Sequence, residues 1–297
     1  MPCRSHRLAA LGFALLLSGC TTIRPVPFTE PPQPPQPVFS HELLGQVLHR
    51  FVDTEGRVDY LALRDSVKDL EHYYLLLATY SPDSHPPLFP TSDHRLAYWI
   101  NAYNAATLKA VLHHYPIASV MDVETPAPLF FLPQGSGFFA LQRLIFGATA
   151  ISLYDVENDI VRPRFAEPRV HFALNCASAG CPRLPNRAFS AANLDTELER
   201  ETRNFLSEGR NFHIDHAEKT ISLSSIFQWY EEDFLNWYRE EFAGQQATLL
   251  KYVALYLPPR RAAELRRSEA TYRLQFTPYD WRLNDQHPLP VPPADAR

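Results

Sequence analysis

Apolar side chains recur at helical spacing in several segments of the chain. One stripe comprises Leu44, Val47, Leu48 and Phe51, and a second comprises Val67, Leu70, Tyr74 and Leu77. This period predicts amphipathic helices over residues 41–52 and 63–80. The same reasoning predicts helices over residues 190–209, 224–238 and 247–257.

A further helix is predicted over residues 92–115, with Ser92 or Asp93 as its cap and Pro116 beyond its end. Its apolar residues lie nearly all the way round the helix instead of on one stripe. A helix of that kind is buried on several sides. We therefore expect it at the centre of the fold.

Shorter segments are typical of strands. They are residues 146–153, 169–175, 211–215 and 219–224, and the last two predict a hairpin that turns at residues 216–219. In an extended 169–175 segment, Val170, Phe172 and Leu174 would face the core, and His171, Ala173 and Asn175 would face the other way. Helices followed by adjacent strands predict an α+β fold, with the central helix and further helices packed against a small, mostly antiparallel sheet.

The N-terminus has the pattern of an export signal. Arg4 and Arg7 precede a short apolar run that ends in Leu17-Ser18-Gly19-Cys20. This tetrapeptide resembles the bacterial lipobox, which implies a signal peptide over residues 1–19 and a lipid on Cys20. Because residue 21 is Thr and not Asp, the resemblance favours the outer membrane, with the protein facing the periplasm.

Residues 24–38 contain seven prolines and no glycine. Proline fixes φ and lacks a backbone donor, so we expect a semi-rigid spacer that holds the folded part about 50 Å from the membrane. The predicted organisation is therefore a lipidated N-terminus and spacer over residues 20–39 and a single α+β domain over residues 40–297.

The charge pattern excludes one class of partner. The formal net charge is −5 and no basic stripe is present, so we expect no nucleic-acid partner. After removal of the signal peptide, Cys176 and Cys181 are the remaining cysteines beyond Cys20. In an oxidising envelope the two must be explained together.

Residues 170–182, VHFALNCASAGCP, carry the candidate chemistry and leave three interpretations open. Cys176 and Cys181 form a disulfide, Cys176 is a catalytic nucleophile, or both are inert thiols. A nucleophilic cysteine needs a nearby base, and His171 is the nearest candidate, with Glu157 or Asp280 to orient it. A straight strand would separate His171 from Cys176 by about 16 Å, which argues against a direct pair.

Four polar residues are candidates for a binding pocket: Asn101, Asn104, Asn175 and Ser178. Asn101 and Asn104 are three positions apart, so they share one side of the central helix. Buried amides without partners cost about 1–3 kcal/mol, so both should be hydrogen-bonded, either to neighbouring loops or to a substrate. The spacing of Cys176 and Cys181 does not match a zinc site, and we expect neither a metal nor a cofactor.

The chain resembles the domain-of-unknown-function-547 family. The pieces that carry the resemblance are GRVDY (56–60), LAYWINAYNA (96–105), ISLYDVEND (151–159), PRVHFALNCASAGCP (168–182) and YDWRLND (279–285). The family brings no established reaction, and it is distantly similar to transglutaminase-like and papain-like thiol folds. Two functions remain open: a module that binds an envelope ligand or protein in a polar pocket braced by Cys176–Cys181, or a thiol hydrolase or acyltransferase acting on an amide or ester.

Overall fold

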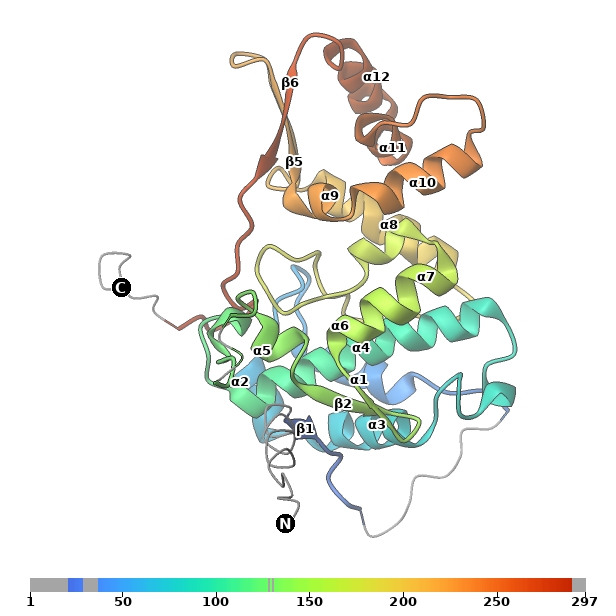
Figure 1. Ribbon diagram of the computed structural model, residues 1–297, viewed down its shortest axis with the longest axis vertical. Coiled ribbons are helices and arrows are strands. Elements are labelled where there is room, and N and C mark those ends of the chain that lie inside the picture. The colour runs from blue at the N-terminus through green and yellow to red at the C-terminus, as the bar shows by residue number, and fades with distance from the viewer. Residues whose placement is uncertain (1–20, 29–36, 128, 130, 290–297) are drawn as a thin grey trace, which may run out of the picture.

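The computed structural model describes residues 21–28, 37–127, 129 and 131–289. Within these ranges, no helix combines the length and the apolar composition that crossing a bilayer requires. The described chain has an α+β fold with two hydrophobic cores, one above the other in Figure 1.

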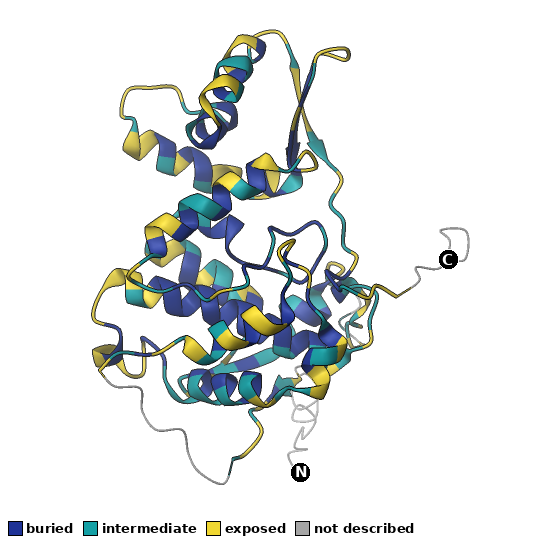
Figure 2. Cartoon of the chain, turned by 180° about the vertical axis from the view of Figure 1, so that it is seen from behind, coloured by how far each residue is buried: buried dark blue, intermediate teal, exposed yellow. Residues whose placement is uncertain are grey.

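The first core is built around one long helix. The helices of this half are α1 (Glu42–Phe51), α2 (Tyr60–Asp65), α3 (Lys68–Thr79), α4 (Ser92–His114) and α5 (Ser136–Phe139). Most side chains of α4 are buried, from Leu96 to Val111, and neighbouring elements cover this helix (Figure 2). The predicted central helix is thus confirmed.

Local capping explains where these helices begin. The cap of α4 is Thr91, one residue before the predicted position, and its hydroxyl accepts the His94 N–H at 3.3 Å. The segment predicted as one helix over residues 63–80 is divided into α2 and α3. The Asp59 side chain caps α2 by accepting the Ala62 N–H at 2.9 Å, and Ser66 in a non-helical conformation ends it.

The second core gathers the C-terminal helices and one sheet. Its elements are α8 (Leu194–Ser207), β4 (Phe212–Asp215), β5 (Thr220–Ser224), α9 (Ser225–Trp229), α10 (Glu231–Glu241), α11 (Leu249–Tyr256), α12 (Pro259–Ser268) and β6 (Arg273–Thr277). Helix α8 joins the two cores, because Leu194 and Leu198 belong to the first and Phe205 and Leu206 to the second. The two halves therefore share a packed element.

The described strands form two small mixed sheets instead of the one, mostly antiparallel sheet that was predicted. In the first, β2 (Arg143–Phe146) lies between β1 (Thr22–Ile23), which is parallel to it, and β3 (Thr149–Ile151), which is antiparallel. In the second, the predicted hairpin of β4 and β5 is confirmed and β6 pairs parallel to β5. Both parallel partners are distant in sequence, so neither leaves a local turn signal.

The N-terminal segment packs against the fold on both sides of its undescribed part. Ile23 is buried in the first core, its carbonyl accepts the Tyr74 hydroxyl at 2.8 Å, and Phe39 is buried further along. Because Ile23 lies three residues after Cys20, it is at most about 11 Å from that residue. The predicted spacing of about 50 Å between the lipidated Cys20 and the folded part is therefore wrong. The signal peptide (residues 1–19) and Cys20 itself lie outside the described residues.

Of the remaining elements, η2 (Pro86–Leu88) and η3 (Val120–Asp122) lie within the first half, and the others lead from it toward α8. These others are α6 (Leu153–Asp155), η4 (Val156–Val161), α7 (Arg162–Phe165) and η5 (Pro168–Phe172). After β6 the chain returns alongside both halves to the first one (Figure 1). There Leu283 bridges to Ser178, and Asn284 accepts the Val58 N–H at 2.9 Å. The C-terminal segment thus clamps the loop that contains both cysteines.

Candidate functional site

The segment predicted as a strand over residues 169–175 is instead the short 3-10 helix η5 followed by an irregular turn. Pro168 opens η5, and the Glu167 side chain caps it by accepting the Arg169 N–H at 3.1 Å. The side chains consequently do not alternate between two faces. Val170 enters the first core, Phe172 enters the second, and His171 points to a polar cluster between them.

The Asn104 side chain makes the backbone hydrogen bonds to residues 173–175 that a neighbouring strand would otherwise make. Its amide donates to the Ala173 carbonyl at 2.9 Å, and its carbonyl accepts the Asn175 N–H at 2.8 Å. Asn175 in turn accepts the Ala177 N–H at 2.9 Å and donates to the Pro182 carbonyl at 2.8 Å. A side chain of α4 therefore satisfies the backbone leading into the cysteine loop, as buried polar groups require.

Asn101 does the same for the segment that precedes α8. It donates to the Phe189 carbonyl at 2.7 Å and accepts the Phe189 N–H at 3.0 Å. The expectation that Asn101 and Asn104 are hydrogen-bonded inside the fold, to neighbouring loops, is confirmed. Neither residue lines either of the two cavities described next.

A cavity of about 600 Å³, which we call the aromatic cavity, opens where the two cores meet. Helix α4, η4, η5, the cysteine loop, α9 and the C-terminal segment all contribute to its wall. Its aromatic lining comprises Tyr103, Phe139, Tyr154, Trp229, Tyr230, Tyr279 and Trp281. The rings of Trp229 and Trp281 are stacked with centroids 5.9 Å apart, and Tyr279 lies against both.

Glu157 supplies a carboxylate to this aromatic wall. Tyr103 and Tyr230 lie close to it in the cavity wall. Burial, with the negative charge of Glu157, raises the pKa of both tyrosines well above the ordinary value. Both phenols therefore stay protonated and uncharged at neutral pH.

Glu157 lies on a π-helical turn, η4, between α6 and α7. The Arg162 N–H bonds the Glu157 carbonyl five residues earlier, and Pro163 follows with no N–H to continue an α-helical ladder. This wider turn presents Glu157 and Arg162 to the same cavity. Single π turns are frequent at functional sites.

His171 and Arg162 are both held by Asp233, from the first turn of α10. The His171 Nε2 atom lies 2.8 Å from Asp233 Oδ2, and Arg162 donates to both carboxylate oxygens at 2.6 and 3.0 Å. Burial by itself would raise the pKa of Asp233, but the hydrogen bonds from His171 and Arg162 outweigh it and hold that pKa well below its usual range. The imidazole also stacks on Tyr230 with centroids 3.9 Å apart.

Cys176 and Cys181 form a disulfide. The Tyr279 hydroxyl lies 3.2 Å from each sulfur, and the Ser178 hydroxyl is 3.1 Å from the Cys176 Sγ atom. The loop between the cysteines is held by backbone bonds from Ala179 N–H and Gly180 N–H to the C-terminal segment, at 2.6 and 2.7 Å. The disulfide is thus part of a braced wall.

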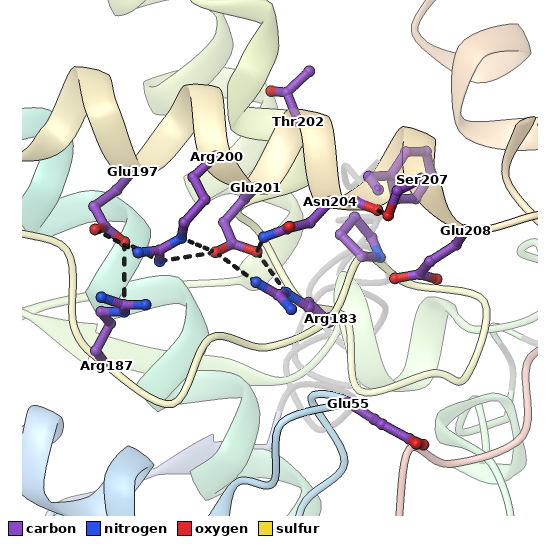
Figure 3. A network of polar contacts seen from close by, with 12 residues as sticks. Glu55, Arg183, Arg187, Glu197, Arg200, Glu201, Thr202, Asn204, Ser207 and Glu208 are labelled. Carbon is purple, nitrogen blue, oxygen red and sulfur yellow. Dashed lines mark hydrogen bonds and ion pairs between the residues drawn. The ribbon is translucent and has the colours of Figure 1, made fainter. Parts of the chain in front are cut away.

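A second cavity of about 570 Å³, the polar cavity, lies on the other side of this loop, and Cys181 and Pro182 line both. On one side of it, Arg183 donates to Glu201 on α8 at 2.8 Å (Figure 3). Burial would raise the pKa of Glu201, but the bonds from Arg183, with Arg200 and Asn204, lower it below its usual value. Glu55 projects from the opposite wall (Figure 3).

The structure divides the candidate residues between the two cavities. Cys176, His171 and Glu157 line the aromatic cavity, whereas Asn175, Ser178 and Asp280 line the polar one. Asp280 is paired with Arg282 and does not line the cavity that His171 lines, and the carboxylate that contacts the imidazole is Asp233. In the described part of the chain, no cluster of three or more His, Cys, Asp or Glu side chains is placed to hold a metal.

Sequence reasoning missed several residues of the aromatic cavity, namely Tyr103, Arg162, Trp229, Tyr230, Tyr279 and Trp281, and also Asp233 behind it. Tyr103 and the pair Tyr279 and Trp281 lie inside the WINAYN and YDWRLND pieces, which were singled out for other residues. For Arg162 and Asp233, 71 positions apart, no local signal exists.

Residues 89–206 match the model of a family described as "Protein of unknown function, DUF547". The matched residues run from just before α4 to the end of α8 and include the WINAYN and HFALNCAS pieces. The resemblance stated from the sequence is confirmed over that range. No curated protein and no solved structure matches the chain, and the distant likeness to transglutaminase-like and papain-like folds stays a prediction.

Proposed function

We propose that this chain, with its DUF547 domain, is a binding module that takes a small ligand, or one side chain of a partner, into the aromatic cavity. The cavity has the volume, the apolar walls and the few convergent polar groups that are typical of ligand sites. The Cys176–Cys181 disulfide braces one wall and keeps the Cys176 sulfur out of nucleophilic chemistry. This is the observation that carries the proposal.

Exposed aromatic rings at the cavity add support. Trp229 is 47% exposed and Tyr154 is 54% exposed, although both line the cavity. Exposed apolar patches often mark interaction surfaces. A ligand in the cavity would cover them.

Tryptophan fluorescence provides the test, because Trp229 and Trp281 line the cavity. The probes are benzyltrimethylammonium, benzyl alcohol and benzenesulfonate, which share one ring and differ in charge. At least one should bind saturably to the parent and lose most of its affinity in Trp229→Ala. Leu274→Ala, which removes an exposed side chain on β6, is the matched control and should bind normally. Absence of saturable binding for all three probes would contradict the proposal.

The second candidate is a cysteine-dependent hydrolase or acyltransferase. Cys176 and His171 line the same cavity, and Asp233 contacts the imidazole as an orienting carboxylate would. In this alternative the disulfide must first be reduced, and His171 must turn its ring toward Cys176. The reduced protein would then hydrolyse a nitrophenyl ester, whereas reduced Cys176→Ser would not.

The proposed location is the cell envelope, with lipid on Cys20 and the domain in the periplasm beside the outer membrane. LSGC supports this proposal, and the packing of Ile23 implies that the domain lies close to the anchor. Cys20→Ser should release the protein from the membrane fraction or leave it unprocessed. Cys3→Ser, in the positively charged region of the predicted signal, is the control and should remain membrane-bound.

A further inference from the structure

The charged groups of the aromatic cavity do not cancel. Besides its tyrosines, the ionisable side chains that line it are Glu157, Arg162 and His171. Arg162 is held by two hydrogen bonds to Asp233, so the guanidinium charge is already matched by a carboxylate behind the wall. With a neutral imidazole, the cavity and its supporting carboxylate carry one net negative charge, that of Glu157.

The Glu157 carboxylate has room for one more partner. A carboxylate has about four acceptor positions, and the neighbouring hydroxyls of Tyr103 and Tyr230 can fill at most two of them. Glu157 is partly exposed and lines the cavity, so its remaining positions are open to a ligand.

The rings around this carboxylate favour the same sign of charge in a ligand. The face of an aromatic ring is negative, and aromatic cages bind ammonium groups through it. Tyr103 and Tyr230 lie at Glu157, and the stacked pair Trp229 and Trp281 forms a further wall. A ligand that enters with a positive charge meets the carboxylate and these aromatic walls, of which Tyr230 already has Arg162 over its ring at 5.1 Å and His171 stacked on it at 3.9 Å.

The polar cavity has no aromatic side chain in its lining, and the one lining carboxylate without a basic partner among the described residues, Asp285, accepts a hydrogen bond from the Tyr115 hydroxyl at 2.9 Å. Each of its arginines is paired within the wall or behind it: Arg57 with Glu55, Arg183 with Glu201, Arg210 with Glu208 and Arg282 with Asp280. Arg210 also donates to the carbonyls of Ala179 and Cys181, at 2.6 and 3.0 Å, which fixes the cysteine loop. These contacts support the wall instead of attracting an ion.

We infer that the ligand of the aromatic cavity carries a cationic group, an ammonium or a quaternary ammonium, which Glu157 binds while the surrounding rings enclose it. This inference rests on the proposed binding function and deepens it by naming the ligand class. It also gives the π turn a role, because that turn places Glu157 and Arg162 at the same cavity.

The experiment compares pairs of probes that differ in charge: choline with 3,3-dimethyl-1-butanol, its neutral carbon analogue of the same shape, and benzyltrimethylammonium with benzyl alcohol. Titrations are read by tryptophan fluorescence at pH 8, above the ordinary histidine pKa of about 6.5. We expect each cation to bind the parent about tenfold more tightly than its neutral partner. Glu157→Gln keeps the size of the side chain and one acceptor oxygen and removes the charge, so it should abolish most of this preference.

Glu264→Gln is the matched control, since Glu264 is also partly buried and hydrogen-bonded, at 2.8 Å to His216, but lies outside the cavity. It should keep the full preference. Equal binding of cation and neutral partner by the parent would overturn the inference and leave the binding module standing. A preference that survives in folded Glu157→Gln would overturn it as well, whereas failure of every probe to bind would contradict the binding function itself. If Glu157→Gln does not fold, the comparison in the parent decides alone.

Discussion

The His171 Nε2 atom lies 2.8 Å from Asp233 Oδ2, and this contact joins η5 to α10 across the boundary between the two cores. The His171 side chain is 1% exposed and that of Asp233 25%. Asp233 also holds Arg162, so one carboxylate positions two side chains of the cavity wall.

Replacing this carboxylate should therefore destabilise the fold. Asp233→Ala leaves a buried imidazole and a partly buried guanidinium without their acceptor, and the free energy of unfolding should fall by about 1–3 kcal/mol. Urea denaturation measures the change. Glu240→Ala, an exposed position on the same helix, should lie within about 0.5 kcal/mol of the parent. Equal effects of the two variants would contradict the role given to Asp233.

The same group predicts a pH dependence. Because the pKa of Asp233 is lower in the folded protein than the unfolded value of about 3.9, its contribution to the free energy of unfolding is complete well above pH 3.9. That contribution is lost as the pH falls from this value toward the folded pKa. The difference in unfolding free energy between the parent and Asp233→Asn should thus shrink as the pH falls from about 5 to 3. Urea denaturation of both proteins across this pH range measures the difference. A difference that grows as the pH falls would contradict the prediction.

Asn104 should matter for the backbone of the cysteine loop. Asn104→Leu removes the donor to Ala173 and the acceptor of Asn175, leaving two buried backbone groups unpaired. We expect a loss of about 2–4 kcal/mol in unfolding free energy. Asn236→Leu, at an exposed position of α10, is the control and should be near neutral. A neutral Asn104→Leu would mean that this segment is held by other contacts.

The close approach of the cysteine loop to the C-terminal segment provides a steric test. A Cβ atom at Gly180 would lie 2.8 Å from the Asp280 backbone nitrogen, whereas a Cβ at Gly209 would meet nothing within 4 Å. Gly180→Ala should therefore cost about 1–3 kcal/mol and weaken probe binding. Gly209→Ala should be neutral or slightly stabilising. Thermal denaturation compares the two variants. Similar melting temperatures would argue against close packing of the C-terminal segment on the cysteine loop.

The central helix tests the first core. Ile100 is completely buried, so Ile100→Ala should reduce the unfolding free energy by about 2–5 kcal/mol. Leu61→Ala, at a position that is 44% exposed on α2, should change it far less. Chemical denaturation of both variants distinguishes them. Equal stability would contradict the burial of α4.

Helical spacing predicted α1 and α4 well because burial of one stripe, or of the whole surface, leaves a pattern in the chain itself. The stripe Leu44, Val47, Leu48 and Phe51 is buried as expected. The alternation in residues 169–175 was misleading. Val170 and Phe172 do enter cores, but two different ones, and a single side chain, Asn104, replaces the neighbouring strand that the pattern implied.

The candidate site was predicted only where its residues lie close in the chain. Cys176 and His171 were found together, and a cysteine pairing was one of three open interpretations. Asp233 was not found, because its contact with His171 spans 62 positions and depends on how α10 packs against η5. Local spacing carries no information about such contacts.

The measurement that tests the central claim most directly is alkylation of the purified protein with iodoacetamide before and after reduction, with each cysteine followed by mass spectrometry. If the module is braced by a disulfide, neither Cys176 nor Cys181 should be labelled at pH 7 until a reductant is added. After reduction, His171→Ala should not change the labelling rate of Cys176. Rapid labelling of Cys176 without reductant, slowed by His171→Ala, would contradict the binding module and support the thiol enzyme.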